Sequence, residues 1–331
     1  MPHPLARSNL KIKAGLKFQF DGTDYKLGGK LGDGAVGIVR KATADNGKEV
    51  AIKFLAPDPK YIDPEFFDDV AGRFIAEGKR GSKLEHPGLV DIYGYSANEN
   101  GGDFASGNPS NPYLMMERVK GKTLESIIRD SDAEFDFTRE RLYIALQITD
   151  AITYIHQKRM VHRDIKPANI FVSGHTKKHN LPKIKIGDFG IVKWGDFHRH
   201  LATGAMTVTN QKGLGTMKYM SPEQATDPKR ISIKSDVFSV GITFYELFTG
   251  DILASAHHVF QLMSTRMTRG TTNARFMSLG HKLVGDEDAF CEKLLDCFLR
   301  GISSRPKIVQ LHGCLSALYS LLFDTDWRTE Q

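Results

Sequence analysis

The side chains best suited to catalysis or ligand binding lie in one short polar stretch, Val161 to Ile170. Between its apolar ends it holds an imidazole, a guanidinium, a carboxylate, an ammonium and an amide, from His162, Arg163, Asp164, Lys166 and Asn169. A buried strand would leave such groups unpaired at high cost, and Pro167 lacks the N–H that a continuing helix needs. The stretch is therefore a loop. It is either an ordinary polar surface loop, or one whose Asp164, Lys166 and Asn169 face a hydroxyl, a phosphate and a metal ion.

The bulk composition is that of an ordinary globular protein with room for one large domain or two lobes. The chain has 331 residues, 40% of them hydrophobic and 25% charged, and a net charge of +6. This mild positive charge suits a protein that handles anionic ligands, but we find no nucleic-acid-binding motif and expect no nucleic-acid partner. Cys291, Cys297 and Cys314 lack the paired spacing of a zinc site, which favours buried free thiols over a metal or disulfide role.

The sequence has neither a membrane-spanning pattern nor a signal-peptide pattern. No stretch approaches the ~18 apolar residues that a membrane span needs. The N-terminal residues Met1 to Arg7 lack the apolar core of a signal peptide. We therefore expect a cytoplasmic protein without a membrane span.

Three glycines near the N-terminus, Gly32, Gly34 and Gly37, form the pattern G-x-G-x-x-G. Dinucleotide-binding folds use the same spacing to open a helix. Here a strand-like run follows, from Ile38 to Thr43, and Asp45-Asn46-Gly47 provides the next turn. This order predicts a glycine-rich hairpin, either a plain flexible one or one whose backbone amides close over phosphates.

The next predicted strand, Glu49 to Leu55, carries Lys53 between apolar neighbours. One interpretation is a surface lysine whose stem snorkels along apolar surface. The other is a fixed cation that contacts the α- and β-phosphates of a nucleotide and is held by a carboxylate. A helical segment from Phe66 to Leu84 follows and contains Glu77.

The later part of the chain predicts mainly helices around one small hairpin. Apolar residues recur at helical spacing between Thr138 and Met160, and the run from Ile233 to Gly250 is apolar around most of its circumference, which is typical of a buried helix. Between these helices, 170–172 and 184–186 predict a hairpin around a turn with His175 and His179. A solvated basic turn is favoured there over a metal site. Gly187-Asp188-Phe189-Gly190 ends the hairpin, and a carboxylate at a glycine-bounded turn is a good magnesium ligand.

The order of these motifs resembles that of the serine/threonine protein kinases, with bacterial Hanks-type kinases the nearest in character. The motifs are the glycine loop, the strand lysine, His-Arg-Asp-Ile-Lys-Pro-Ala-Asn, Asp-Phe-Gly, Gly-Thr followed by Ser-Pro-Glu, and the later Asp236 and Arg305. The resemblance covers about residues 21–320.

This resemblance implies an α+β, two-lobed protein-kinase-like fold, with a small β-rich N-lobe that has one main helix and a larger α-helical C-lobe. We predict an N-terminal extension over 1–20, the N-lobe over 21–119 and the C-lobe over 120–331. The implied activity is transfer of the γ-phosphoryl group of ATP, with Mg²⁺ or alternatively Mn²⁺, to serine or threonine hydroxyls of protein substrates. A pseudokinase scaffold and a small-molecule or lipid kinase on the same fold remain alternatives.

The resemblance also assigns roles to individual residues. The catalytic set is Asp164, Lys166 and Thr216, and the metal ligands are Asn169 and Asp188. ATP binding is assigned to Leu31, Gly32, Asp33, Gly34, Ala35, Val36, Gly37, Ile38, Val39, Ala51, Lys53, Glu77, Met116, Glu117 and Val119, with Lys53 and Glu77 as an ion pair. Structural roles fall to His162, Phe189, Gly190, Glu223, Asp236 and Arg305, with Glu223 paired to Arg305 and Asp236 bound by amides of the catalytic loop.

Regulation is expected through Arg163, whose guanidinium sits next to the catalytic carboxylate and would bind an anion. A phosphothreonine in the following segment could supply that anion, with Thr207 and Thr209 the first candidates and Thr203 the next. Because the sequence shows neither a membrane span nor a sensor domain, we expect the activating signal to arrive through a regulatory partner or through the lobes themselves.

The sequence departs from the family pattern at Gly78, Gly81 and Ser221. Each interior glycine costs a helix about 1 kcal/mol relative to alanine. We therefore predict that the helix with Glu77 is loosely held, that its docking limits activity, and that Gly81→Leu raises basal activity. Ser221 stands where the family usually has alanine.

Overall fold

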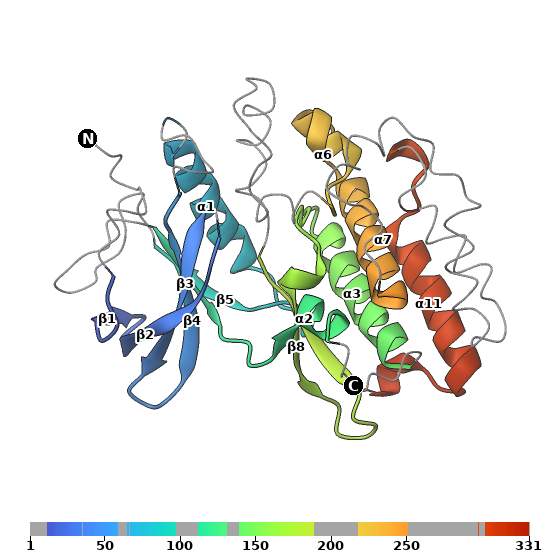
Figure 1. Ribbon diagram of the computed structural model, residues 1–331, viewed down its shortest axis with the longest axis horizontal. Coiled ribbons are helices and arrows are strands. Elements are labelled where there is room, and N and C mark those ends of the chain that lie inside the picture. Colours follow the sequence, from blue (N-terminus) through green and yellow to red (C-terminus); the bar gives the residue numbers. More distant parts are fainter. Residues whose placement is uncertain are drawn as a thin grey trace. The chain divides into compact units, whose positions relative to one another are not determined.

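The part of the chain that the computed structural model describes comprises residues 12–34, 36–58, 65, 67–96, 112–130, 139–188, 218–250, 297 and 302–330. They fall into two compact units. Unit 1 takes in the described residues of Met1–Glu85 and Val90–Val119, and unit 2 those of His86–Leu89, Lys120–Gly190 and His200–Gln331. Figure 1 shows the sheet of unit 1 with a long helix beside it, and the long helices of unit 2.

Unit 1 is built on a six-stranded antiparallel sheet in the order β1-β2-β3-β4-β6-β5. Its strands are β1 (Lys17–Phe20), β2 (Thr23–Asp33), β3 (Gly37–Ala44), β4 (Glu49–Leu55), β5 (Ile92–Tyr95) and β6 (Tyr113–Glu117). The turn between β3 and β4 forms where its residues predict it, because Gly47 adopts φ 84° and the Asn46 side chain accepts a hydrogen bond from the Lys48 amide at 2.9 Å.

Apolar side chains cover both faces of this sheet. One face packs on helix α1 (Phe67–Gly81), where Val70 and Phe74 meet Leu55 and Leu114 in a buried cluster. The other face holds a second cluster, which contains Phe18, Tyr25, Leu27, Ala42, Ala44, Val50, Ile52, Phe54, Tyr113 and Met115. Successive side chains of β4 point to opposite faces of the sheet, so β4 contributes residues to both clusters.

The last residues of the predicted N-terminal extension, 1–20, form a strand on the sheet of unit 1, which the sequence did not indicate. Lys17–Phe20 form the edge strand β1, and Phe18 stacks on Tyr25 of β2 with ring centroids 5.4 Å apart. Phe20 from this edge reaches Gly94 on the opposite edge strand, where an added Cβ atom would overlap the Phe20 ring. The sheet is therefore curled, and Gly94 makes the closing contact.

Two glycines of α1 are closely packed, which contradicts the reason for predicting a loosely held helix, whereas the predicted effect on activity stays a prediction. Gly78 and Gly81 are buried on the side of α1 that faces the sheet. A Cβ atom at Gly78 would lie 2.7 Å from Tyr95 Cβ and would overlap Leu114, and one at Gly81 would overlap Ile92. The glycines therefore allow α1 to approach β5 and β6 closely, and Gly81→Leu would be expected to push the helix away rather than to strengthen its docking.

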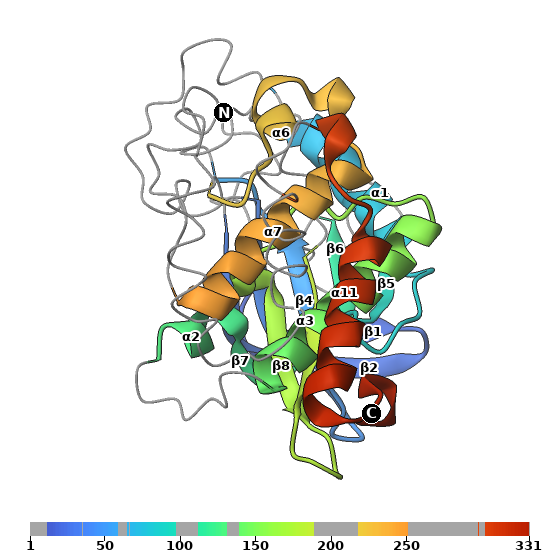
Figure 2. The ribbon, with the colours of Figure 1, turned by 90° about the vertical axis from the view of Figure 1, so that its right-hand side faces the viewer.

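Unit 2 is dominated by three long helices, α3 (Arg139–Gln157), α7 (Ile233–Thr249) and α11 (Ile308–Phe323). Its shorter helices are α2 (Leu124–Ile128) and α6 (Pro222–Thr226), with 3-10 helices at Pro167–Asn169, Pro228–Arg230, Ile302–Ser304 and Trp327–Glu330. Helix α3 packs on both α7 and α11, as Figures 1 and 2 show. The periodic apolar residues predicted for α3 are all buried: Leu142, Ala145, Ile148, Ile152 and Ile155.

A small sheet in the order β7-β8-β9 lies next in the chain to Asn169 and Asp188. Its strands are β7 (Lys122–Thr123), β8 (Ile170–His175) and β9 (Pro182–Ile186). β8 starts directly after Asn169 and β9 ends directly before Gly187-Asp188. The predicted hairpin is confirmed, and its two open ends carry the two predicted metal ligands.

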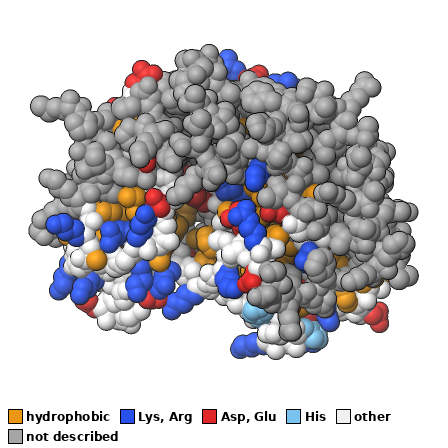
Figure 3. Space-filling view, viewed as in Figure 1, with side chains coloured by type: hydrophobic (Ala, Val, Ile, Leu, Met, Phe, Trp, Pro, Cys, Tyr) orange, Lys and Arg blue, Asp and Glu red, His pale blue; other side chains and the backbone are white. Residues whose placement is uncertain are grey.

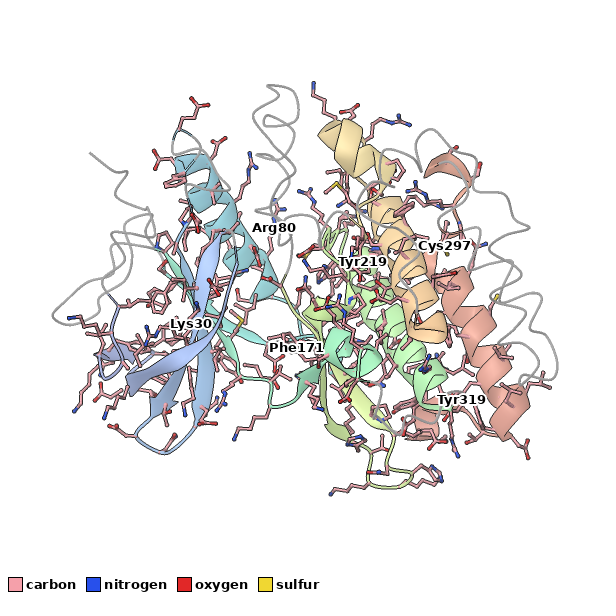
Figure 4. All side chains as sticks on the ribbon, viewed as in Figure 1. Lys30, Arg80, Phe171, Tyr219, Cys297 and Tyr319 are labelled. Carbon is pink, nitrogen blue, oxygen red and sulfur yellow. The ribbon has the colours of Figure 1, made fainter. Side chains whose placement is uncertain are left out.

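The last described residues pack into unit 2 through two buried side chains, Trp327 and Glu330. Glu330 accepts hydrogen bonds from Arg139 at 2.7 Å and from Tyr319 at 3.4 Å, and it pairs with His179 in the β8–β9 turn. Figure 4 labels Tyr319 on α11. This carboxylate ties the end of the chain to α3, α11 and the turn. In the described ranges, no helix combines the length and apolar composition of a membrane span.

The two glycine environments in α1 give a direct test of close packing. Gly78→Ala should lower the free energy of unfolding by about 1–3 kcal/mol, because its Cβ has no space against Tyr95 and Leu114. Gly72 lies in the same helix, and a Cβ atom added there would meet nothing within 4 Å, so Gly72→Ala should raise that free energy by about 0.5–1 kcal/mol through helix propensity alone. Urea denaturation followed by circular dichroism measures both, and equal effects would contradict close packing at Gly78.

Candidate active site

Asp164, Lys166 and Asn169 form one buried cluster in unit 2. The Lys166 ammonium lies 3.1 Å from both Asp164 carboxylate oxygens. The Asn169 side-chain amide donates to the backbone carbonyl and to the carboxylate of Asp164, both at 2.8 Å. All three residues are at most 8% exposed. The carboxylate therefore has a fixed orientation before any ligand binds, and the interpretation of this stretch as an ordinary surface loop is wrong.

The buried carboxylate of Asp236 on α7 holds the backbone of this loop. The amides of His162 and Arg163 donate to its two oxygens, each at 2.8 Å, as the resemblance implied. His156 at the end of α3 contacts the same carboxylate at 2.9 Å. Consecutive amides can point at one carboxylate because Arg163 adopts φ 73°, in the left-handed region. Three donors offset the cost of burying the charge.

His156 and Gln224 are site residues that the sequence analysis missed. Gln224 on α6 donates from its side chain to the Arg163 carbonyl at 3.0 Å. The backbone of Arg163 is thus held at its N–H by Asp236 and at its C=O by Gln224. A histidine in a last helical turn and a glutamine in a short helix have no local pattern that reveals such long-range contacts.

The element Ser221-Pro222-Glu223 forms the start of α6, and Ser221 caps it. The Ser221 hydroxyl accepts from the Gln224 amide at 3.4 Å, and the Gln224 side chain accepts from the Ser221 amide at 3.0 Å, which is a capping box. The serine that departs from the family pattern therefore has a local role that alanine could not fill.

Glu223 and Arg305 form the predicted ion pair inside unit 2. The guanidinium donates to both carboxylate oxygens, at 2.5 Å and 3.0 Å, and the Ser235 hydroxyl donates to one of them at 2.8 Å. Arg305 also lies over the Phe238 ring, 5.0 Å from its centroid. Burial alone would raise the pKa of Glu223, but the bonds and charge of Arg305 outweigh it and hold this pKa below its ordinary value of 4.5.

Asn169 and Asp188 supply an oxygen donor set that fits Mg²⁺. The Asn169 amide nitrogen is engaged with Asp164, which leaves its side-chain oxygen as the group for a cation. Asp188 adopts φ 62°, and the adjacent Gly187 amide donates to the Asn169 carbonyl at 3.0 Å. Among the described residues no cluster of three or more His, Cys, Asp or Glu could hold a metal. Mg²⁺ is commonly held by one or two protein oxygens together with water and phosphate oxygens, so this small set suffices.

Lys53 and Glu77 are brought together in unit 1. The ammonium lies 3.9 Å from a Glu77 carboxylate oxygen, and it sits 5.9 Å from the centroid of the Phe74 ring. The Lys53 side chain is 13% exposed and that of Glu77 is 3% exposed. A snorkelling lysine would keep its ammonium in water, so the structure favours the fixed cation.

The glycine pattern forms a hairpin between β2 and β3, and not the start of a helix. The Gly34 amide donates to the Gly37 carbonyl at 2.9 Å, and a Cβ at Gly37 would lie 2.5 Å from the Phe54 carbonyl oxygen. Gly37 is therefore required by close contact with β4. The predicted residues around this hairpin are Leu31, Gly32, Asp33, Val36, Ile38 and Val39, with Ala51 next to Lys53 on β4.

The segment Met116 to Val119 ends unit 1. Met116 packs against the cluster under α1, and the Glu117 amide donates to the Asp91 carbonyl at 2.8 Å. That amide is therefore engaged within unit 1. The next side chain, Arg118, pairs with Glu49, which also accepts from Lys41 at 3.0 Å. The sequence analysis missed this pairing, which joins Arg118 to the sheet.

Several predicted residues lie outside the described residues. They are Ala35, Phe189, Gly190, Thr203, Thr207, Thr209 and Thr216. The contact predicted between Thr216 and Asp164 and the anion predicted for Arg163 therefore stay predictions.

The sequence of this chain is similar to those of known proteins. A family model described as the protein kinase domain matches residues 25–310. A probable serine/threonine-protein kinase of Corynebacterium efficiens is 35% identical over 227 residues, which cover 68% of this chain and 31% of the relative. The serine/threonine-protein kinase PknB of Mycobacterium tuberculosis is 33% identical over 230 residues, which cover 69% of this chain and 32% of PknB. The matched region thus spans about a third of the length of these relatives.

The Glu223–Arg305 pair yields a stability prediction. Arg305→Ala should lower the free energy of unfolding by about 3–5 kcal/mol, because it leaves a buried carboxylate without its main partner. Since the folded-state pKa of Glu223 lies below 4.5, the stability that it contributes is present above pH 4.5 and is lost as the pH falls through the folded-state value. Chemical denaturation between pH 7 and pH 3 measures both effects.

The matched control removes both partners. Glu223→Gln combined with Arg305→Met should cost less than Arg305→Ala alone and should weaken the acid dependence, because no buried charge remains. A double variant less stable than the single one would contradict this account.

Proposed function

The chain belongs to the protein kinase domain family, and we propose that it is a serine/threonine protein kinase that transfers the γ-phosphoryl group of ATP to protein hydroxyls. The observation that carries the proposal is the buried cluster of Asp164, Lys166 and Asn169 on a loop held by Asp236. Phosphoryl transfer depends on positioning and charge stabilisation, and these side chains are already fixed by hydrogen bonds. The names of the relatives support the substrate class.

Unit 1 would bind the nucleotide. Lys53, oriented by Glu77, would contact the α- and β-phosphates, and the hairpin around Gly34 would cover them with backbone amides. The Glu117 carbonyl and the Val119 amide would bind adenine, with Met116 at the rear of its pocket. We assign 21–119 to this nucleotide-binding lobe and 120–331 to the catalytic lobe.

Unit 2 would bind the acceptor and the metal. Asn169 and Asp188 would hold Mg²⁺, or alternatively Mn²⁺, which neutralises charge on the phosphates when bound. Asp164 would orient the acceptor hydroxyl and take its proton late, as the acceptor oxygen bonds to the γ-phosphorus and ADP leaves. Lys166 would neutralise the γ-phosphate, and a lysine here suits a serine/threonine kinase. Thr216 would bridge Asp164 and Lys166.

The first test removes the proposed base. Asp164→Ala should lower transfer of labelled phosphate to protein by at least about 100-fold while ATP still binds, because the nucleotide contacts assigned above are made by other residues. Phosphate incorporation into generic protein substrates and the fluorescence of a labelled ATP analogue measure the two steps.

Asp130→Ala is the control for this test. Asp130 pairs with Lys122 through exposed side chains, and neither residue has a role in the proposed transfer, so its loss should leave transfer unchanged. Undiminished transfer by Asp164→Ala would reject the base assignment. Transfer to a small molecule or lipid, and to no protein, would favour the alternative kinase class.

Regulation would act through Arg163. Asp236 and Gln224 fix its backbone, so its guanidinium extends from an immobile point and could bind a phosphothreonine at Thr207 or Thr209, or at Thr203. Fixing the backbone reduces the ordering cost of that contact. A regulatory protein partner and a cytoplasmic location complete the proposal.

Mass spectrometry of protein incubated with Mg-ATP tests this regulation. We expect phosphate on Thr207 or Thr209 in the wild-type chain and none in Asp164→Ala, which excludes a contaminating kinase. Arg163→Met should retain the phosphate and lose most of the gain in activity that phosphorylation gives. A fully active chain without phosphate on these threonines would remove the switch.

A further inference from the structure

The turn between β8 and β9 carries a concentrated positive charge that the proposed chemistry does not use. From Ile170 to Gly187 the chain has four lysines, Lys177, Lys178, Lys183 and Lys185, and two histidines, but no aspartate or glutamate. Lys177, Lys178 and Lys183 are exposed, as are both histidines. Figure 3 shows lysine and histidine side chains gathered at the lower edge of the molecule, below β8.

Hydrogen bonds hold the backbone of this basic turn, residues 175–183, in place. The buried Thr176 accepts from the Leu181 amide through its hydroxyl at 3.0 Å, and its own amide donates to the Leu181 carbonyl at 2.7 Å. Gln147 on α3 binds both the Pro182 carbonyl, at 2.8 Å, and the Ile184 amide, at 3.1 Å. Because the backbone is held, the exposed ammonium groups project from a fixed base, as Figure 4 shows at the lower end of the hairpin.

Among the described residues, the carboxylate that contacts the turn is that of Glu330, and it is engaged with His179 and Arg139. Within the described part of the chain, Lys177, Lys178 and Lys183 form no ion pair. Like charges close together raise the energy of the free protein and favour binding of an anion.

We propose that the basic turn is a docking site for an acidic peptide segment, rich in Asp and Glu, of a protein substrate; this inference rests on the proposed kinase activity. A membrane surface or a nucleic acid fits the turn less well. The exposed large apolar side chains in the described part of the chain are Leu31, Tyr93, Val309 and Leu321. None lies in the turn, where a membrane or a base stack would need one.

The hairpin connects this site to the catalytic loop within one unit. β8 has six residues and therefore spans roughly 20 Å, with Asn169 before its first residue and the basic turn after its last. A substrate held at the turn would keep its acceptor segment near Asp164, so docking would raise the effective concentration of the acceptor. The expected effect is on KM more than on kcat.

Binding of a labelled peptide tests the site without relying on catalysis. The probe is a fluorescent peptide of about eight Asp and Glu residues, and its matched control replaces them with Asn and Gln. We expect the acidic probe to bind and the neutral one not to bind. Lys177→Glu/Lys178→Glu/Lys183→Glu should weaken binding about tenfold or more, and added salt should weaken it as well. Lys17→Glu/Lys26→Glu is the control, because it reverses exposed charges on β1 and β2 in unit 1.

Kinetics then separate failure of the docking site from failure of the kinase proposal. A serine peptide fused to the acidic segment should show a KM about tenfold lower than its Asn/Gln version, and the turn variant should remove that difference. Equal binding by both charge-reversed variants, or preferential turn-dependent binding of phosphatidylserine vesicles or of single-stranded oligonucleotides, would overturn the inference. Phosphorylation of neither peptide, with turn-dependent binding intact, would reject the kinase activity and leave the acidic-segment site standing.

Discussion

The arrangement of unit 2 depends on one buried carboxylate, that of Asp236. It receives two consecutive backbone amides and an imidazole, and it is completely inaccessible to solvent. A carboxylate in such a place is stable only if its donors stay where they are, so the loop at 162–164 is as fixed as the helix that carries Asp236. The Asp164 cluster inherits that rigidity, and Gln224 extends it to α6.

Local sequence patterns predicted the main helices and strands because apolar periodicity, turn residues and strand-like runs indicated the same elements. The apolar period of α3, the turn residues after β3 and the predicted strand from Glu49 to Leu55 all formed the expected structure. The contacts Lys53–Glu77, Glu223–Arg305 and Asp236 with its loop amides were predictable only through the order of family motifs, since their residues lie far apart in the sequence. Their roles in catalysis remain proposals.

The remaining features depend on tertiary contacts that leave no local signal. His156, Gln224 and Glu49 are polar residues on ordinary elements, and only the packing of distant segments shows what they bind. The N-terminal strand β1 was missed because two apolar residues in a basic stretch are a weak strand signal, whereas pairing with β2 determines the outcome.

The helix glycines show how helix propensity can mislead. Gly78 and Gly81 lower the helix propensity of α1, but they let α1 approach β5 and β6 closely. A larger residue would not fit, because Tyr95, Leu114 and Ile92 occupy the space that its side chain would need. The same contacts determine the geometry of the Lys53–Glu77 ion pair. Steric contact between α1 and the sheet positions Glu77 relative to Lys53, with 3.9 Å between the carboxylate oxygen and the ammonium. The distance between Lys53 and Glu77 therefore reports the position of α1, which the close contacts at Gly78 and Gly81 determine.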